Sequence, residues 1–211
     1  MKTQMGWGTL TDTQSPYEYH FTLYYTEIVP GLFCGAQPRH AEDVAYLQRV
    51  EGITAVLNLQ QDHDPVFWNV KLEDVVAACA AAGIKHVRRP AKDFDPHSLR
   101  KTLPSAVPVV KKEMERGGRV YVHCTAGLGR APAVCIAYLY WVHGLQLGEA
   151  YDFLTAKRPC GPKKDAIRGA TYDVMDSRRA DFEGFSRLPA HAWATLNNND
   201  RLVLQSLLPP A

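Results

Sequence analysis

The stretch VYVHCTAGLGRAPAV, Val120 to Val134, runs from a β-branched segment into a glycine-containing loop and then into a helix-forming segment. His123 and Cys124 end the apolar segment, and Arg130 follows Cys124 by six residues. Successive backbone N–H groups in such a loop can point inward and form a nest for an anion, and the N-terminus of the following helix adds partial positive charge. The stretch therefore predicts a strand, an anion-binding loop and a helix, in that order.

The residue types in this loop are suited to holding and attacking a phosphate group. Gly127 and Gly129 permit the φ values and the close backbone approach that an anion nest needs, and the planar fork of Arg130 can grip two phosphate oxygens. In that positive field we expect Cys124 to be ionised and to act as a nucleophile, with His123 supporting the loop from behind. The alternative is an inert buried thiol beside a satisfied histidine, but chance produces this spacing in roughly one chain per thousand of this composition. The predicted phosphate-binding loop consists of Thr125, Ala126, Gly127, Leu128, Gly129 and Arg130.

A thiolate that attacks phosphorus needs an acid to protonate the departing oxygen. The candidates are Asp93 and Asp95 in the segment KDFDP. Asp95 directly precedes Pro96 and is better suited to capping a helix, so we assign the acid to Asp93. In the predicted reaction Cys124 attacks while Asp93 protonates the leaving oxygen, and water activated by Asp93 then hydrolyses the phosphocysteine. The loop N–H groups and Arg130 stabilise the charge on the equatorial oxygens, and neither a metal nor another cofactor is required.

Strands alternate with helices along the chain, which predicts a three-layer α/β domain with a largely parallel sheet. Two short strands are expected around the Pro30-Gly31 turn, and further strands at 53–60, 84–90 and 119–124. Helices are expected at 39–52, 70–83, 98–116, 131–144, 147–159 and 163–176. Pro104 and Pro108 are expected to bend the helix at 98–116 or to confine it.

The composition excludes several classes of protein. The chain has 211 residues and a formal net charge of +2, from 24 basic and 22 acidic residues, which is too balanced for a nucleic-acid-binding surface. No apolar run approaches the ~18 residues that a membrane span needs. The five cysteines are scattered and show no zinc-ligand spacing, so we expect a reducing compartment and no structural metal. The N-terminal segment shows neither a signal peptide nor a transit peptide.

The expected organisation is a single catalytic domain with two extensions. Residues 1–15 are expected to be a disordered lead, residues 16–176 the catalytic domain, and residues 177–211 an extension packed on that domain. A carbohydrate-binding module is not expected, and the chain is expected to be a monomer.

The segment CTAGLGRAP resembles a known family. Its cysteine, glycine and arginine are the signature of the cysteine-dependent protein tyrosine phosphatases, dual-specificity branch. Most members of that branch carry Ser or Thr after the arginine, whereas Ala131 and Pro132 follow here, which is similar to the glucan phosphatases of starch metabolism and, more distantly, to laforin. The segments SPYEYHFTLYYTEIVPGLFCGAQP, VLNLQQDHDPVFW, GIKHVRRPAKDFDPHSLR and AKRPCGPKKDAIRGATYD extend the resemblance over roughly residues 15–175.

The resemblance implies hydrolysis of phosphate monoesters at C6 or C3 of the glucosyl units of amylopectin-like starch glucans, in a plastid. It carries Cys124, Arg130 and Asp93 over as the catalytic residues, and it implies a phosphorylated glucan such as starch, amylopectin or maltooligosaccharide as the partner. Phe67 stands where the family commonly has tyrosine. The implied glucan-binding residues are Tyr17, Tyr19, Phe67, Trp68, Lys85, Arg89, Phe94, Arg100, Gly161, Tyr172 and Trp193.

The aromatic candidates also have a physical rationale. Sugar rings present flat C–H faces that stack on aromatic planes, and the segments PVFW and PYEYH are expected in loops, where large apolar side chains otherwise have little use. The alternative is packing, and for Trp193 the anchoring of the tail is an equal explanation. Two other functions stay open: a dual-specificity phosphatase acting on phosphoprotein or phosphoinositide, and a catalytically silent glucan-binding scaffold. The absence of lysine inside the loop counts against a phosphoinositide.

Overall fold

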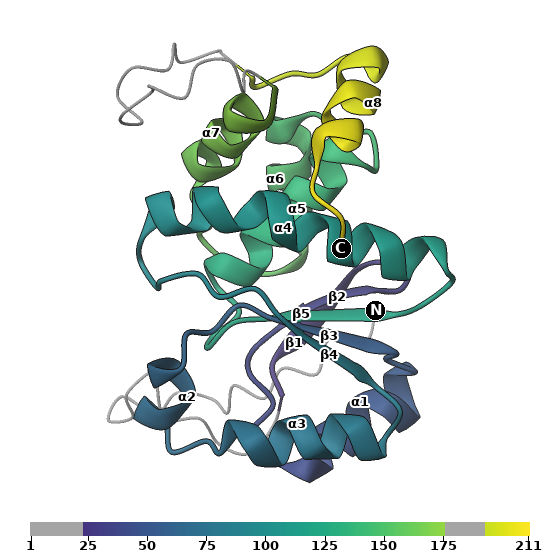
Figure 1. The fold of residues 1–211 in the computed structure, drawn as a ribbon, viewed down its shortest axis with the longest axis vertical. Coiled ribbons are helices and arrows are strands. Elements are labelled where there is room, and N and C mark those ends of the chain that lie inside the picture. Colours follow the sequence, from purple (N-terminus) through teal and green to yellow (C-terminus); the bar gives the residue numbers. More distant parts are fainter. Residues whose placement is uncertain (1–22, 176–192) are drawn as a thin grey trace.

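The central element is one mixed sheet with the strand order β1-β2-β5-β3-β4 (Figure 1). The computed structural model describes residues 23–175 and 193–211, and within them the sheet has five strands. Strands β1 and β2 are antiparallel across the turn at Pro30 and Gly31, and the other pairs are parallel. The bounds are β1 Tyr25–Val29, β2 Leu32–Gly35, β3 Ala55–Asn58, β4 Lys85–Arg88 and β5 Val120–His123.

Helices cover both faces of the sheet, which confirms the expected three-layer α/β fold. Helices α1, α2 and α3 lie on one face, and α4 to α8 lie on the other (Figure 1). The bounds on the first face are α1 Ala41–Glu51, α2 His63–Phe67 and α3 Leu72–Ala81. On the second face they are α4 Pro96–Glu115, α5 Arg130–Trp141, α6 Leu147–Lys157, α7 Lys164–Met175 and α8 Asn198–Leu207.

The strand register brings the carboxyl ends of four strands to one edge of the sheet. Asn58 of β3 pairs with Arg88 of β4 on one side and with His123 of β5 on the other. Gly35 of β2 also pairs with His123. The loops that follow these strands therefore meet at one edge, which is where parallel α/β sheets place their ligands.

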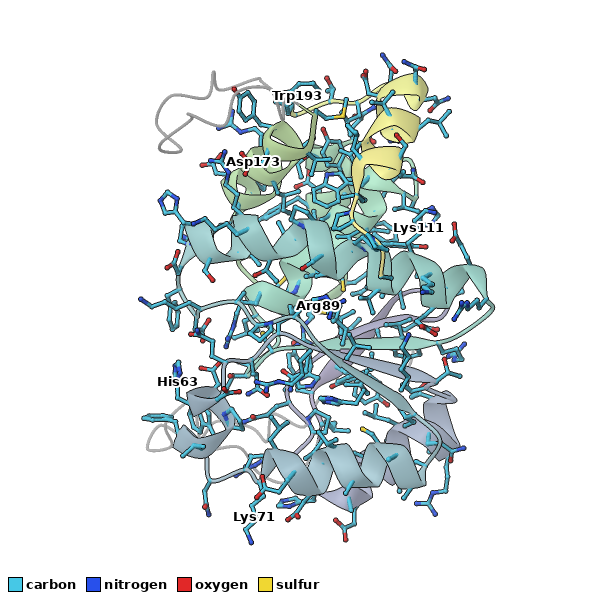
Figure 2. The ribbon with its side chains drawn as sticks, viewed as in Figure 1. His63, Lys71, Arg89, Lys111, Asp173 and Trp193 are labelled. Atoms are coloured by element: carbon cyan, nitrogen blue, oxygen red, sulfur yellow. The ribbon has the colours of Figure 1, made fainter. Side chains whose placement is uncertain are left out.

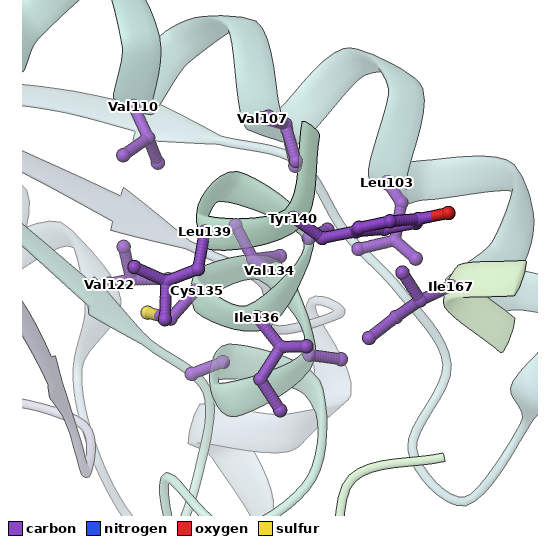
Figure 3. Close-up of a cluster of buried hydrophobic side chains, with 14 of the residues drawn as sticks. Leu103, Val107, Val110, Val122, Val134, Cys135, Ile136, Leu139, Tyr140 and Ile167 are labelled. Atoms are coloured by element: carbon purple, nitrogen blue, oxygen red, sulfur yellow. The ribbon is translucent and has the colours of Figure 1, made fainter. Parts of the chain in front are cut away.

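Helix α5 is buried on all sides because it lies between the sheet and other helices. Figure 3 shows its side chains surrounded by Leu103 and Val107 of α4, Val122 of β5 and Ile167 of α7. This placement explains the nearly continuous apolar sequence of α5, since a helix without a solvent face needs no polar stripe. A second, smaller cluster fills the other face of the sheet, beneath α1 and α3.

Helix α4 differs from the expectation for its prolines. It runs without interruption from Pro96 to Glu115 with Pro104 and Pro108 inside it, so the idea that the prolines confine it is wrong. Each proline removes one backbone donor, but the buried face of α4 packs along α5 and α7 and holds the helix together. Its start is as expected of a capped helix, because the carboxylate of Asp95 accepts hydrogen bonds from two backbone N–H groups at 2.9 Å.

The C-terminal helix α8 packs on α5 and α7. The guanidinium of Arg201 donates to the carbonyl oxygens of Tyr140 and Leu145, and the amide of Gln205 donates to that of Trp141. These bonds use the carbonyl groups at the end of α5 and in the turn after it. Among the described residues no helix is both long and apolar enough to cross a membrane.

Candidate active site

The loop between β5 and α5 lies at the carboxyl edge of the sheet. Strand β5 ends at His123, and α5 begins at Arg130. Cys124 follows the strand directly and is only 3% exposed. The structure thus confirms the predicted order of strand, loop and helix, and it places the thiol at the buried start of the loop.

Four consecutive carbonyl oxygens of this loop, those of residues 125–128, are hydrogen-bonded to groups outside it. The N–H of Gln37 donates to Thr125, and the N–H of Gly161 donates to Leu128. The guanidinium of Arg158 donates to the two carbonyl oxygens between them, those of Ala126 at 3.3 Å and Gly127 at 2.8 Å. In a trans peptide the carbonyl of one residue and the N–H of the next point in opposite directions, and the described peptides are all trans. The N–H groups that follow these carbonyls therefore point to the opposite side, which is the orientation that an anion nest requires.

Arg158 donates two of these hydrogen bonds, more than any other residue. Its side chain is fully buried, with its guanidinium 4.0 Å from the ring centroid of Tyr24. The guanidinium thus lies beneath the loop as a fixed positive charge on the side opposite the N–H groups. We conclude that Arg158 holds the loop in the shape that an oxyanion requires.

Gly127 is required at its position for two separate reasons. Its φ of 68° lies in the left-handed region, and a Cβ atom there would lie 2.4 Å from the backbone of Gly35 and 2.6 Å from Nη2 of Arg158. Gly35 is itself tightly packed against Tyr121. The loop therefore passes too close to β2 for any side chain at position 127.

Arg130 is held by two carboxylates of different exposure. Its Nη1 lies 2.5 Å from Oδ2 of Asp64, which is 9% exposed, and its Nη2 lies 3.0 Å from Oδ2 of Asp93, which is 40% exposed. Nη1 also donates to the carbonyl of Ala91 at 3.0 Å and Nη2 to the hydroxyl of Thr125 at 3.1 Å. Burial alone would lower the pKa of Arg130, but the charges of Cys124 and the two aspartates raise it above its ordinary value. The guanidinium is therefore charged and fixed beside the nest.

Asp93 and Phe94 form a strained corner next to Arg130. Phe94 is 97% exposed and has a φ of 54°, which is rare for a side chain of this size. Its N–H donates to Oδ1 of Asp93 at 3.1 Å. Such backbone strain is usually retained where it orients a functional group, and here it orients the carboxylate that was predicted to be the acid.

His123 supports the loop from the side of the sheet. It is 1% exposed, and its Nδ1 lies 3.1 Å from the carbonyl oxygen of Cys124. Because a carbonyl can only accept, Nδ1 must carry the proton. Burial lowers the pKa of His123 to about 3, so the imidazole is neutral at neutral pH.

Some of the predicted glucan-binding residues lie at the same edge of the sheet. Phe67, 79% exposed, ends α2, which also supplies Asp64 to Arg130. The segment PVFW was expected in a loop, and that expectation is wrong, since its first residues belong to this short helix. Trp68 packs partly on the core beneath α3, with its ring 5.3 Å from that of Phe67. Phe94 is next to Asp93, and Gly161 bonds the loop itself.

Two other predicted residues, Lys85 and Arg100, form ion pairs away from the loop. Lys85 begins β4, at the opposite end of the strand from the loop, and its Nζ lies 2.5 Å from Glu113. Arg100 is buried and paired with Asp173 of α7. Figure 2 shows Asp173 and Trp193 on the far side of α4 from the sheet, whereas Arg89 lies at the level of the sheet.

The contacts of the remaining candidates explain their positions. Arg89 follows β4, but its guanidinium donates to the carbonyl of Ser105 in α4. Trp193 packs against the large core cluster, and its carbonyl accepts a hydrogen bond from Tyr140 at the end of α5. Tyr172 is 7% exposed within α7. Tyr17 and Tyr19 lie outside the described residues.

Sequence reasoning missed three groups that build the site: Asp64, Arg158 and a pair of glutamines. The amide of Gln60 donates to Gln37 at 2.7 Å and to the hydroxyl of Thr125 at 3.1 Å. Gln60 and Asp64 follow the buried strand β3, and polar residues after a parallel strand are a signal of a site. For Arg158, at the end of α6, the sequence carries no comparable signal.

The substitution Gly127→Ala should reduce turnover of a small aryl phosphate by roughly 100-fold, because the loop must move away from Gly35 and its N–H groups lose their alignment. Gly117→Ala is the matched control, since Gly117 also has a positive φ of 75° but no atom lies within 4 Å of an added Cβ. Steady-state kinetics of both variants measure the difference. Equal losses in the two variants would mean that backbone strain alone is responsible.

The stability of the fold should depend on the protonation of His123. Its pKa is depressed in the folded state, so the unfolded chain binds the additional proton and stability is lost as pH falls from about 6.5 toward about 3. The contribution of His123 should approach roughly 1.4 kcal/mol per pH unit. Urea unfolding at pH 7, 6 and 5 measures it, with His123→Gln as the comparison. A variant with the same pH slope as the parent chain would contradict this assignment.

Comparisons with known proteins agree with the geometry of this site. Residues 32–168 match the family model described as dual specificity phosphatase, catalytic domain. The chain is 40% identical over 165 residues to the amyloplastic phosphoglucan phosphatase DSP4 of Castanea sativa, covering 77% of this chain and 44% of that protein. It is 33% identical over 159 residues to the chloroplastic phosphoglucan phosphatase LSF1 of Arabidopsis thaliana, covering 75% of this chain and 27% of that protein.

The chain thus spans less than half the length of these two curated relatives. Among solved structures, the crystal structure of PTPMT1 has the same fold, with a TM-score of 0.59 and 22% identity over 70% of this chain and 91% of that one. The match to the family model runs from β2 through the loop after β5 and ends within α7. This chain belongs to the dual-specificity phosphatase family.

Proposed function

We propose that this chain is a phosphoglucan phosphatase, which removes phosphate monoesters at C3 or C6 from amylopectin-like glucan through a phosphocysteine. One observation carries the choice of substrate: each of the two segments that supply a carboxylate to Arg130 also carries an exposed phenylalanine. Helix α2 supplies Asp64 and Phe67, and the loop between β4 and α4 supplies Asp93 and Phe94. Exposed aromatic rings beside a phosphate site are suited to the C–H faces of sugar rings. The names of the two plant relatives support the same reading.

The reaction begins when the sulfur of Cys124 attacks phosphorus within the nest. The N–H groups of the loop and the guanidinium of Arg130 bind the equatorial oxygens, where negative charge develops. Phosphate oxygens take the place of the Asp93 carboxylate on Nη2 of Arg130, and the acid is thereby released toward the departing glucosyl oxygen. Once it has left the guanidinium, Asp93 takes up a proton from solvent and gives that proton to the glucosyl oxygen as the bond to phosphorus breaks. A phosphocysteine and a dephosphorylated glucan result.

The second step regenerates the thiolate. Asp93, now a carboxylate, takes a proton from a water molecule that attacks the phosphocysteine from the side that the glucan has left. Arg130 and the nest stabilise the same charges as in the first step, and inorganic phosphate leaves. The nucleophile, the acid and base, and the groups that bind the phosphate oxygens all come from this chain, and water is the second reactant.

The remaining features of the proposal follow from the family. The catalytic domain spans residues 16–176, and residues 177–211 form an extension to it; the contacts of α8 with α5 and α7 support this division. The chain acts as a monomer in a plastid on phosphorylated starch, amylopectin or maltooligosaccharide, and it engages neither nucleic acid nor a membrane. The plastid location is supported by the amyloplastic and chloroplastic relatives.

The function is tested by phosphate release from phosphorylated amylopectin, a phosphotyrosyl peptide and a small aryl phosphate, with Cys124→Ser as the inactive control. We expect turnover of amylopectin and of the aryl phosphate, and little turnover of the peptide. Robust activity on the peptide with none on amylopectin would instead identify a protein phosphatase. Binding of glucan without turnover of any substrate would identify a silent scaffold.

The aromatic platform is tested by Phe67→Ala. Loss of a stacking surface should lower kcat/KM for phosphorylated amylopectin roughly tenfold and leave aryl phosphate turnover unchanged. Val66→Ala is the matched control, because Val66 is 74% exposed on the same helix and has no ring. If Phe67→Ala affects both substrates equally, Phe67 supports the site and does not bind sugar.

A further inference from the structure

Asp64 is an acidic residue at the centre of a site that must bind an anion. Its side chain is 9% exposed, and its Oδ2 lies 2.5 Å from Nη1 of Arg130, which is 3% exposed. A fixed negative charge repels phosphate, so the carboxylate must contribute something that outweighs this repulsion. Breaking a buried ion pair also leaves an uncompensated charge, which is strongly unfavourable.

The hydrogen bonds of Arg130 indicate what Asp64 contributes. Nη1 is occupied by groups of the fold itself, the carboxylate of Asp64 and the carbonyl of Ala91. Nε is buried and has no hydrogen-bond partner within the described part of the chain. Nη2 bonds the hydroxyl of Thr125 and the exposed carboxylate of Asp93. One end of the guanidinium is therefore anchored, and the edge formed by Nε and Nη2 is left for a bidentate grip on phosphate.

The carboxylate of Asp64 is itself held in place by its neighbours. Its Oδ2 also accepts a hydrogen bond from the N–H of Gln61 at 2.9 Å, and its Oδ1 lies 3.5 Å from Nε2 of His63. Asp62, two residues before Asp64, is 90% exposed and pairs with Arg88 at 2.7 Å. Two neighbouring carboxylates thus have different roles, and only the buried one contacts Arg130.

We propose that Asp64 is a positioning residue that fixes Nη1 of Arg130 and so presents the Nε–Nη2 edge of the guanidinium to phosphate. The pairing also ties α2, with Phe67 at its end, to the arginine that holds the reacting group. This inference rests on the proposed phosphatase chemistry but not on the identity of the glucan, because Arg130 meets the phosphate of any substrate.

The test compares Asp64→Asn, Asp64→Glu and the control Asp62→Asn in the full chain, with a small aryl phosphate as substrate and inorganic phosphate as competitive inhibitor. Asp64→Asn should lower kcat/KM and raise the inhibition constant of phosphate, each roughly tenfold or more. Asp64→Glu keeps the charge and should recover part of both losses. Asp62→Asn should stay within twofold of the parent chain. Unchanged kinetics and phosphate inhibition in Asp64→Asn would overturn the proposal.

A second comparison separates positioning from a general loss of structure. If Asp64 acts through Arg130, adding Asp64→Asn to Arg130→Lys should reduce turnover little beyond Arg130→Lys alone. Independent effects that multiply would assign Asp64 to the fold and not to the arginine. Should Asp64→Asn fail to fold, Asp64→Glu takes its place, and an unchanged phosphate inhibition constant in that variant would overturn the proposal.

Phosphorylated amylopectin distinguishes this inference from the proposed function. The loss in Asp64→Asn should appear with amylopectin and aryl phosphate alike, and a loss confined to amylopectin would place Asp64 in sugar binding and overturn its role toward Arg130. If the parent chain does not act on amylopectin at all, the proposed function fails, while the aryl phosphate comparison still decides the role of Asp64.

Discussion

The site depends on hydrogen bonds that draw the carbonyl groups of the loop after β5 away from its centre. Because each peptide is planar and trans, the N–H groups then point toward the centre of the loop. This is the arrangement of an anion nest. The donors come from two distant parts of the chain: Gln37 follows β2, and Arg158 and Gly161 lie between α6 and α7. The fold as a whole therefore maintains the charge environment of Cys124, and the loop does not form it alone.

Burial separates the two aspartates that meet Arg130. Asp64 is enclosed and stays with its partner, whereas Asp93 is 40% exposed and lies on a strained corner from which it can be displaced. This access supports the proposed role of Asp93, because a carboxylate that exchanges a proton with substrate and water must be reachable by both. The difference in exposure thus distinguishes two chemically identical side chains that contact the same guanidinium.

The parts of the fold and site that could be predicted from the sequence are those encoded by neighbouring residues. The strand, the loop and the helix around Cys124 are contiguous, and Asp95 caps α4 as its position before Pro96 suggests. Contacts between distant residues could not be predicted, because period and spacing do not carry them. Arg100 satisfies its charge with Asp173, 73 residues away, and Asp64 reaches Arg130 across 66 residues. The uninterrupted α4 shows the same limit, since packing against α5 and α7 outweighs the local effect of Pro104.

The contact between Gly127 and Gly35 has a consequence for how such a chain can vary over evolutionary time. A methyl group at position 127 would meet the backbone at position 35, and a methyl group at position 35 would meet the ring of Tyr121. Neither glycine therefore accepts a larger residue unless a neighbouring group moves. A chain that keeps this loop geometry is thereby restricted to glycine at both positions, although Gly35 lies in β2 and not in the loop.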